Sequence, residues 1–268
     1  MELILKAIIL GVVEGVTEFL PISSTGHLIL FGHFLHFTGP FAILFEIVIQ
    51  LGAILAVVYY YRQKILDSLK HLRPGQWGFT LWFCMLIAFL PAAVVGLILK
   101  EPIDTYLFSP FTVSIALIVG ALLMIIVENN FSSQKNSDFV HVGVKKSLLI
   151  GFAQCLSLFP GMSRSASTIM GGMIVGLSVK AAAEFSFFLA IPTMVAATGY
   201  SLLKGFQAMT SLEWAALAVG FLVSFLVALI VIGKFLSFLV SHSLKGFAYY
   251  RLLVGIGMLA LIWAGIVV

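Results

Sequence analysis

Six long apolar runs constrain this chain more than any other feature of its sequence. Each has roughly the 20 residues that a helix needs to cross a bilayer. They lie at about 41–61, 79–99, 111–128, 181–203, 212–232 and 247–267. Apolar residues make up 61% of the chain and charged residues only 10%, which is too few charges to cover a water-facing surface. We therefore predict an all-α polytopic membrane protein.

Two further apolar stretches, 3–35 and 147–177, are interrupted near their middle by Pro, Gly and a run of hydroxyls. The interruptions read PISSTGH at 21–27 and PGMSRSAS at 160–167. Neither half of either stretch is long enough to span, so we expect two re-entrant helix–loop–helix hairpins beside the six transmembrane helices. Lys6 falls inside the first stretch and no small-residue cleavage site follows, so we expect this stretch to stay in the mature chain.

Positive charges test this layout, because cytoplasmic loops carry an excess of Lys and Arg. If both hairpins return to the side from which they entered, eleven such residues share one side: Arg62, Lys64, Lys70, Arg73, Lys135, Lys145, Lys146, Lys180, Lys234, Lys245 and Arg251. The opposite side holds three, Lys6, Lys100 and Lys204. This bias places the loop 129–146 in the cytoplasm and both termini outside it.

The two halves of the chain resemble each other at an offset of 140 residues. The aligned segments are ILGVVEGVTEFL at 9–20 with LIGFAQCLSLFP at 149–160, and FEIVIQLGAIL at 45–55 with FSFFLAIPTMV at 185–195. Each half holds one hairpin and three crossings, so the second half is inverted relative to the first. We predict one membrane domain, 1–268, with inverted repeats at 1–128 and 147–268, whose hairpin tips meet near the midplane.

Five ionisable side chains fall inside apolar segments: Glu14, Glu18, Glu46, Glu184 and Arg164. Each costs roughly 2.5–3.5 kcal/mol to place at bilayer depth, so a functional site is the default interpretation. The alternative is structural, with the carboxylates pairing to Arg or to hydroxyls between helices. Glu46 and Gln50 share the spacing of Glu14 and Glu18, and we include Gln50 among the substrate-binding candidates.

Glu14 and Glu18 are four residues apart, which puts both carboxylates on one face of a helix. Gly11 and Gly15 beside them let another backbone approach closely. Two adjacent carboxylates repel each other, so this pair indicates metal binding, proton transfer or both.

The first interruption supplies Ser23, Ser24 and Thr25, followed by His27. Hydroxyls at this place open the second half-helix, where backbone N–H groups and the positive end of the helix dipole bind anions. Capping alone explains one hydroxyl, such as Ser23, but not three hydroxyls with an imidazole.

The second interruption repeats this arrangement around Arg164. A buried guanidinium presents a planar fork of donors that matches phosphate or carboxylate oxygens. The polar residues beside it are Gly161, Ser163, Ser165, Ser167 and Thr168. Together the two tips supply carboxylates, a candidate serine nucleophile, an imidazole and an anion cradle, and phosphoryl transfer fits this set.

A substrate phosphate would be repelled by Glu14 and Glu18, and a divalent cation between them resolves the conflict. Mg²⁺ is the usual choice for phosphates, with Ca²⁺ as the alternative. The sequence has no P-loop or Gly-x-Gly-x-x-Gly context, so we expect neither a soluble nucleotide nor a nucleic acid. A substrate that reacts inside a membrane protein is expected to carry a lipid tail.

The segments 14–27, 45–52 and 160–172 closely resemble the undecaprenyl pyrophosphate phosphatase family of bacteria, of the bacitracin-resistance type. The resemblance covers essentially the whole chain. It implies a multi-pass inner-membrane enzyme that hydrolyses undecaprenyl diphosphate to undecaprenyl phosphate and inorganic phosphate, with its site open to the outer side. It also implies recycling of the lipid carrier for peptidoglycan, a divalent metal, and bacitracin resistance through competition for the substrate. A homodimer is left open.

The resemblance also implies roles for single residues. Glu14 and Glu18 would handle the metal or protons, Ser24 would be the nucleophile, and His27 is its rival as nucleophile or base. Arg164 would hold the diphosphate. The supporting donors would be Ser163, Ser165 and Thr168.

Two other classes of protein share part of this pattern. Type-2 phosphatidic acid phosphatases need a His about six residues after the Arg of their Ser-Arg motif, and Met170 stands there in this chain. A lipid-phosphate flippase or an anion transporter would use the same inverted repeats and the same cradle. A pure anion transporter has little reason to place Glu14 and Glu18 beside its site, so we favour the enzyme.

Overall fold

The computed structural model describes residues 1–131, 138–204 and 209–267, and every regular element in these ranges is helical. Within them, six helices are long and apolar enough to cross a membrane. They are α3 (Pro40–Tyr60), α5 (Trp77–Tyr106), α6 (Pro110–Phe131), α9 (Val179–Lys204), α10 (Ser211–Phe238) and α11 (Lys245–Trp263). All six coincide with the predicted apolar runs, which confirms a multi-pass membrane protein.

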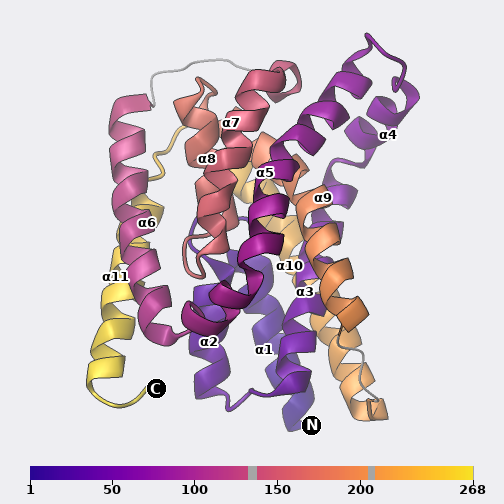
Figure 1. Ribbon diagram of the computed structural model, residues 1–268. Helices are drawn as coiled ribbons and strands as arrows, with labels where there is room; N and C mark the ends of the chain where they lie inside the picture. Colours follow the sequence, from indigo (N-terminus) through magenta and orange to yellow (C-terminus); the bar gives the residue numbers. More distant parts are fainter. Residues whose placement is uncertain (132–137, 205–208, 268) are drawn as a thin grey trace.

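Four shorter helices occupy the two interrupted stretches. They are α1 (Glu2–Thr17), α2 (Ser24–Phe34), α7 (Val144–Gln154) and α8 (Arg164–Ile174), with the 3₁₀ turn η2 (Cys155–Leu158) after α7. In Figure 1, α1 and α2 lie in the lower half of the molecule, whereas α7 and α8 lie in the upper half. We call the loop between α1 and α2 the first tip loop and the loop between η2 and α8 the second. Ser165, in the first turn of α8 just after the second tip loop, donates from Oγ to Leu20 O of the first tip loop at 2.8 Å.

Close helix packing holds these half-length helices in place. α1 packs against α10, and α7 packs against α5. A Cβ atom on Gly11 would lie 2.8 Å from the carbonyl oxygen of Gly220, and one on Gly151 would lie 2.5 Å from that of Ala88. Only glycine lets the two backbones approach this closely, as the sequence predicts for Gly11.

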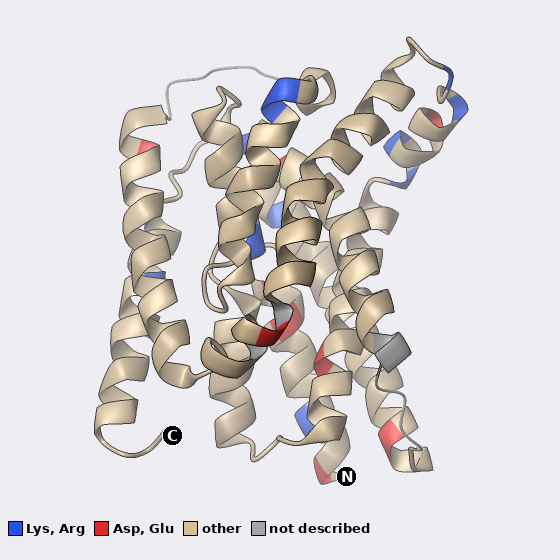
Figure 2. Ribbon diagram, viewed as in Figure 1, with Lys and Arg blue, Asp and Glu red and all other residues tan. Residues whose placement is uncertain are grey.

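Charged side chains are sparse over the long helices, and Lys and Arg gather toward one end (Figure 2). That end carries a short helix absent from the predicted layout, α4 (Arg62–Lys70), in a segment expected to be loop. A further 3₁₀ turn, η1, covers Phe139–His141. Both chain termini lie at the opposite end (Figure 1), as an even number of crossings requires.

The charge count needs one correction. The sequence predicts Arg251 in a loop, but it lies inside α11 and is fully buried, so ten of the eleven residues remain candidates for that side. Among those counted, Lys135 lies outside the described residues, as do the side chains of Lys100 and Lys204. The correction leaves the direction of the bias unchanged.

Candidate active site

The two tip loops end in the same way. Ser23 caps α2 and Ser163 caps α8, with φ of 71° and 72°. Ser23 Oγ accepts from the N–H of Gly26, and Ser163 Oγ accepts from the N–H of Ala166. A positive φ is uncommon for a residue other than glycine, and such strain concentrates at functional sites. Two helix N-termini, each able to attract an anion, therefore begin at the meeting point of the loops.

A cavity of about 180 Å³ lies at this meeting point. Its lining includes eight of the predicted site residues, namely Glu18, Ser23, Ser24, Thr25, Gln50, Gly161, Ser163 and Arg164. The other lining residues are Ser157, Pro160, Thr193, Met194 and Ala197. The fold thus brings most of the predicted catalytic and substrate-binding residues to one place, although they come from segments about 140 residues apart.

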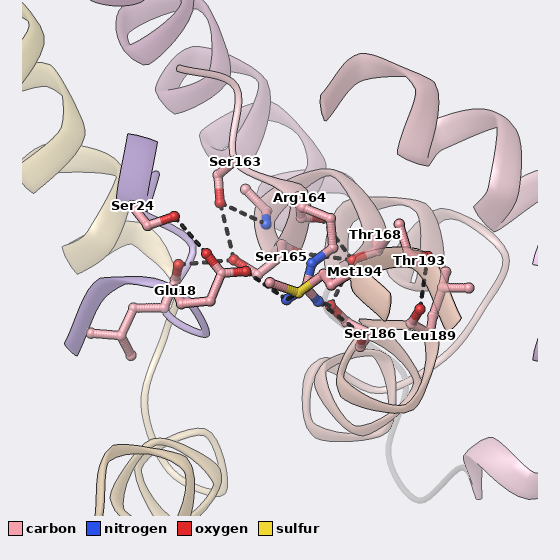
Figure 3. A network of polar contacts seen from close by, with 12 residues as sticks. Glu18, Ser24, Ser163, Arg164, Ser165, Thr168, Ser186, Leu189, Thr193 and Met194 are labelled. Carbon is pink, nitrogen blue, oxygen red and sulfur yellow. Dashed lines mark hydrogen bonds and ion pairs between the residues drawn. The ribbon is translucent and has the colours of Figure 1, made fainter. Parts of the chain in front are cut away.

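Glu18 lies at the start of the first tip loop, between Ser24 at the start of α2 and Arg164 at the start of α8 (Figure 3). Its Oε2 accepts a hydrogen bond of 2.5 Å from Ser24 Oγ. Its Oε1 forms an ion pair of 3.0 Å with Arg164 Nη2. The side chains of Arg164 and Glu18 are only 11% and 5% exposed, so this pair is poorly screened by solvent. The carboxylate therefore holds the Ser24 hydroxyl and the guanidinium on opposite oxygens.

Arg164 is fixed from behind by α9. Its Nη1 donates to the carbonyl oxygen of Ser186 at 3.0 Å and to Ser186 Oγ at 3.2 Å, and its Nη2 contacts Met194 Sδ at 3.5 Å. Thr168 Oγ1 lies 2.6 Å from Ser186 Oγ and so supports the same anchor (Figure 3). Among the described atoms, Arg164 Nε is buried and has no hydrogen-bond partner, so one guanidinium N–H is unused.

The hydroxyls in the first turn of α8 bind backbone and side-chain oxygens of the two tip loops. Ser165 Oγ donates to Leu20 O and lies 3.0 Å from Ser163 Oγ, while Ser167 Oγ donates to Ser163 O at 2.9 Å. Ser165 and Thr168 do not line the cavity. The structure thus places these two predicted substrate-binding residues behind the cradle, where they hold its backbone.

Glu14 does not line the cavity. It is 1% exposed, and within the described part of the chain neither of its carboxylate oxygens has a hydrogen-bond partner. Glu18, Glu46 and Arg164 are close enough for their charges to act on it. A buried carboxylate with two free oxygens is costly unless a proton or a cation satisfies it.

A metal ion is compatible with this donor set only in part. No group of three or more His, Cys, Asp or Glu side chains among the described residues is arranged to hold a metal alone. Glu14 offers two free oxygens, whereas both oxygens of Glu18 are already engaged by Ser24 and Arg164. Mg²⁺ commonly takes one or two carboxylates and completes its shell with phosphate oxygens and water. The residues therefore fit a cation that arrives with a phosphate substrate.

His27 does not line the cavity. Its Nδ1 donates to Ser23 O at 2.7 Å, because a carbonyl can only accept. Nε2 is hydrogen-bonded to the hydroxyl of Tyr250, 2.8 Å away on α11. Both nitrogens are thus engaged in supporting the first tip loop, whereas Ser24 lies in the cavity wall.

Sequence reasoning missed several residues of the site. Ser186 stands opposite Glu46 in the repeat alignment, and this correspondence could have revealed it. Thr193 and Met194 on α9 carry no polar motif that would mark them. Arg251, which contacts both tip loops, looks like a loop charge in the sequence.

Comparison with known proteins finds similarity along nearly the whole chain. The family model described as bacitracin resistance protein BacA matches residues 7–257. An undecaprenyl-diphosphatase of Thermoanaerobacter sp. (strain X514) is 68% identical over 263 residues, covering 98% of each chain. One from Caldanaerobacter subterraneus subsp. tengcongensis is 65% identical, covering 98% of this chain and 97% of the relative. One from Clostridium tetani is 52% identical, covering 97% of both.

Proposed function

Because the chain belongs to the bacitracin resistance protein BacA family, we propose that it hydrolyses undecaprenyl diphosphate to undecaprenyl phosphate and inorganic phosphate. The chain is a phosphatase of the membrane, and the lipid diphosphate is the substrate that its relatives' names give. The observation that carries the proposal is the position of Glu18, which holds Ser24 Oγ on one oxygen and Arg164 on the other. A nucleophile, its base and an anion-binding group thus share one cavity.

In this proposal Ser24 is the nucleophile and Glu18 its general base. Glu18 Oε2 takes the hydroxyl proton as Ser24 Oγ bonds to the terminal phosphorus. The bond from that phosphorus to the bridging oxygen breaks, and undecaprenyl phosphate leaves with that oxygen. Water then displaces Ser24 from phosphorus, and the proton on Glu18 returns to Ser24 Oγ. Inorganic phosphate leaves with the oxygen and both hydrogens of the water.

Arg164 would hold the diphosphate during this reaction. Ser186 fixes one guanidinium nitrogen, so the group is already oriented before substrate arrives. Nε is free, and Nη2 can exchange Glu18 for a phosphate oxygen. That exchange would free Oε1 of Glu18 from its ion pair with Arg164 and so make the carboxylate a stronger base. The N-termini of α2 and α8, with Ser23, Thr25, Gly161 and Ser163, would bind further phosphate oxygens, and Gln50 would contribute from α3.

We assign the divalent cation, Mg²⁺ in preference to Ca²⁺, to Glu14 and Glu18. A bound cation would neutralise the repulsion between these carboxylates and the diphosphate and would polarise its oxygens. The two unpartnered oxygens of Glu14 support this assignment.

We propose that both tip loops belong to re-entrant hairpins in one membrane domain built from two inverted repeats, 1–128 and 147–268. Three correspondences at the offset of 140 support this arrangement. Ser23 and Ser163 cap their helices alike, Gly11 and Gly151 each admit a helix backbone, and α1 on α10 mirrors α7 on α5.

The cavity is proposed to open toward the outer side of the membrane. Its lining follows α9 from Thr193 to Ala197, toward the end of that helix at Lys204. That end of the molecule also holds both termini, opposite the end with α4 and most Lys and Arg (Figures 1 and 2). The positive-inside rule assigns the α4 end to the cytoplasm.

An apolar groove beside the cavity suits the polyprenyl tail. It has a volume of about 350 Å³ and lies between α5 and η2. Leu156 and Leu158 of η2 line the groove, while Ser157 between them lines the cavity. A lipid whose diphosphate occupies the cavity could therefore lay its first isoprene units along α5.

In the cell this activity would regenerate the lipid carrier of peptidoglycan synthesis. Bacitracin would compete for the same diphosphate, and more enzyme would raise resistance. Purified protein in detergent, supplied with Mg²⁺, is expected to release phosphate from undecaprenyl diphosphate. A protein that moves the lipid across vesicles but releases no phosphate would favour the flippase alternative.

A further inference from the structure

Arg251 is the largest fully buried side chain of the described residues that the proposed reaction does not use. It projects from α11, and each of its five N–H groups has a carbonyl acceptor. Nε donates to Leu117 O at 3.3 Å. Nη1 donates to Pro21 O at 3.3 Å and to Met162 O at 3.0 Å. Nη2 donates to Ala116 O at 3.3 Å and to Gly161 O at 3.1 Å.

Three of these five acceptors belong to the tip loops. Pro21 lies two residues before Ser23 in the first tip loop, and Gly161 and Met162 directly precede Ser163 in the second. One planar group therefore binds the backbone of both loops, just before the residues that cap α2 and α8. The other two acceptors, on α6, fix the guanidinium to the helical bundle.

The neighbouring backbone is shaped to admit this group. A Cβ atom on Gly120 of α6 would collide with Nη2 of Arg251. Gly161 has a φ of +98°, and in this conformation its carbonyl oxygen accepts from Nη2 of Arg251. A Cβ atom on Gly161 would lie 2.5 Å from the carbonyl oxygen of Val113. Glycine is the residue that tolerates both conditions.

Among the described residues Arg251 has no carboxylate within ion-pair distance. A charge at bilayer depth costs roughly 2.5–3.5 kcal/mol, and helix packing alone does not require one. A rigid fork of five donors is, however, the one side chain that can satisfy carbonyls on three separate segments at fixed spacing.

We propose that Arg251 is a positioning residue that sets the first tip loop against the second, so that Ser24 faces a phosphate held by Arg164. The consequence for catalysis rests on the proposed function, whereas the joining of the two loops does not. Glu18 begins the first tip loop, Ser24 directly follows it, and Arg164 directly follows the second. Loss of the Arg251 hydrogen bonds would therefore move Ser24 and Glu18 relative to Arg164, while the contacts within each loop would stay.

Arg251→Gln and Arg251→Lys test this role in purified protein, with undecaprenyl diphosphate as substrate. Misplacing reacting groups by about 1 Å costs on the order of 100-fold. We expect kcat of Arg251→Gln to fall about 100-fold per folded molecule, with KM changed less than about threefold, because Arg164 still binds phosphate. Arg251→Lys keeps the charge and some donors, so it should recover part of kcat.

Gly120→Ala tests the same contact without removing Arg251. It should lower kcat in the same direction, while Gly257→Ala on α11, where a Cβ meets no atom within 4 Å, should leave kcat unchanged. The double variant Gly120→Ala/Arg251→Gln should be no slower than Arg251→Gln alone, since both changes break one join. Additive losses would contradict the proposal.

A second readout does not depend on activity. Thr25→Cys on α2 and Ser157→Cys on η2 place two thiols in the cavity lining, one beside each tip loop, in a background with Cys84 and Cys155 replaced by Ser. A short bifunctional thiol reagent should join them efficiently, and Arg251→Gln should reduce the joined fraction at least twofold.

Unchanged cross-linking, or wild-type kcat in folded Arg251→Gln, would overturn the positioning role. If the wild-type protein releases no phosphate from undecaprenyl diphosphate, the proposed function fails. Cross-linking alone then decides whether Arg251 joins the loops.

Discussion

Replacing Glu18 with Gln removes the base and one member of the buried ion pair while keeping the shape of the side chain. A glutamine can accept one hydrogen bond from Ser24 or Arg164, but it cannot take the Ser24 proton. General bases contribute about 10²–10⁴-fold to rate, which corresponds to roughly 2.7–5.5 kcal/mol of activation free energy. We expect kcat to fall within that range.

The Michaelis constant should respond differently. Arg164 is 11% exposed and keeps its contacts to Ser186, so it stays oriented when Glu18 no longer pairs with it. Loss of the competing carboxylate frees Nη2 for the diphosphate, and KM should stay level or fall. Removing one member of a buried pair can cost about 3–5 kcal/mol, so thermal unfolding should be followed alongside turnover.

The assay is phosphate release from undecaprenyl diphosphate by purified variants, normalised to folded protein by gel filtration. Glu184→Gln is the matched control, because Glu184 lies on α9 outside the cavity lining and bonds only weakly to Tyr61 at 3.4 Å. Its kcat should stay within threefold of wild type. A Glu18→Gln protein that is folded and retains more than a tenth of wild-type kcat would refute the assignment of Glu18 as base.

Three further predictions follow from the same geometry. Ser186→Ala removes one hydrogen bond to Arg164, worth about 1 kcal/mol, and should raise KM about fivefold with little change in kcat. Glu14→Gln should raise the Mg²⁺ concentration for half-maximal phosphate release at least about tenfold, which corresponds to a loss of roughly 1.4 kcal/mol in Mg²⁺ binding. An unchanged Mg²⁺ requirement would show that Glu14 is not a ligand. Leu158→Trp fills the groove and should raise KM for undecaprenyl diphosphate but not for a short-chain prenyl diphosphate, whereas Leu97→Trp on the exposed face of α5 should alter neither.

Helix length and hydropathy made the membrane-spanning part of this fold predictable. An apolar run of about 20 residues has few ways to fold other than as a spanning helix, and all six runs became such helices. The tip loops were equally visible, because Pro and consecutive hydroxyls break a helix where no water can satisfy the backbone. The segment of α4 reads as a polar loop because it has only nine residues, three of them basic and one acidic.

The sequence predicts those site residues that lie in or next to the two polar interruptions, 21–27 and 160–167. Ser24, Glu18 and Arg164 stood out because each is polar in apolar surroundings. Their pairing across about 140 residues follows from the tertiary fold, as does the burial of Arg251. A single Arg near the start of an apolar run reads as an interfacial anchor, and its five acceptors come from segments between 89 and 230 residues away.

The central claim is that Ser24, activated by Glu18, attacks the phosphate held at the meeting of the two tip loops. Rapid acid quench of the enzyme with undecaprenyl diphosphate labelled on its terminal phosphate tests this most directly. We predict an acid-stable phosphoserine on the peptide that contains Ser24. The label should be absent in Ser24→Ala, which should also lose turnover. An acid-labile label on His27, or sustained turnover by Ser24→Ala, would contradict it.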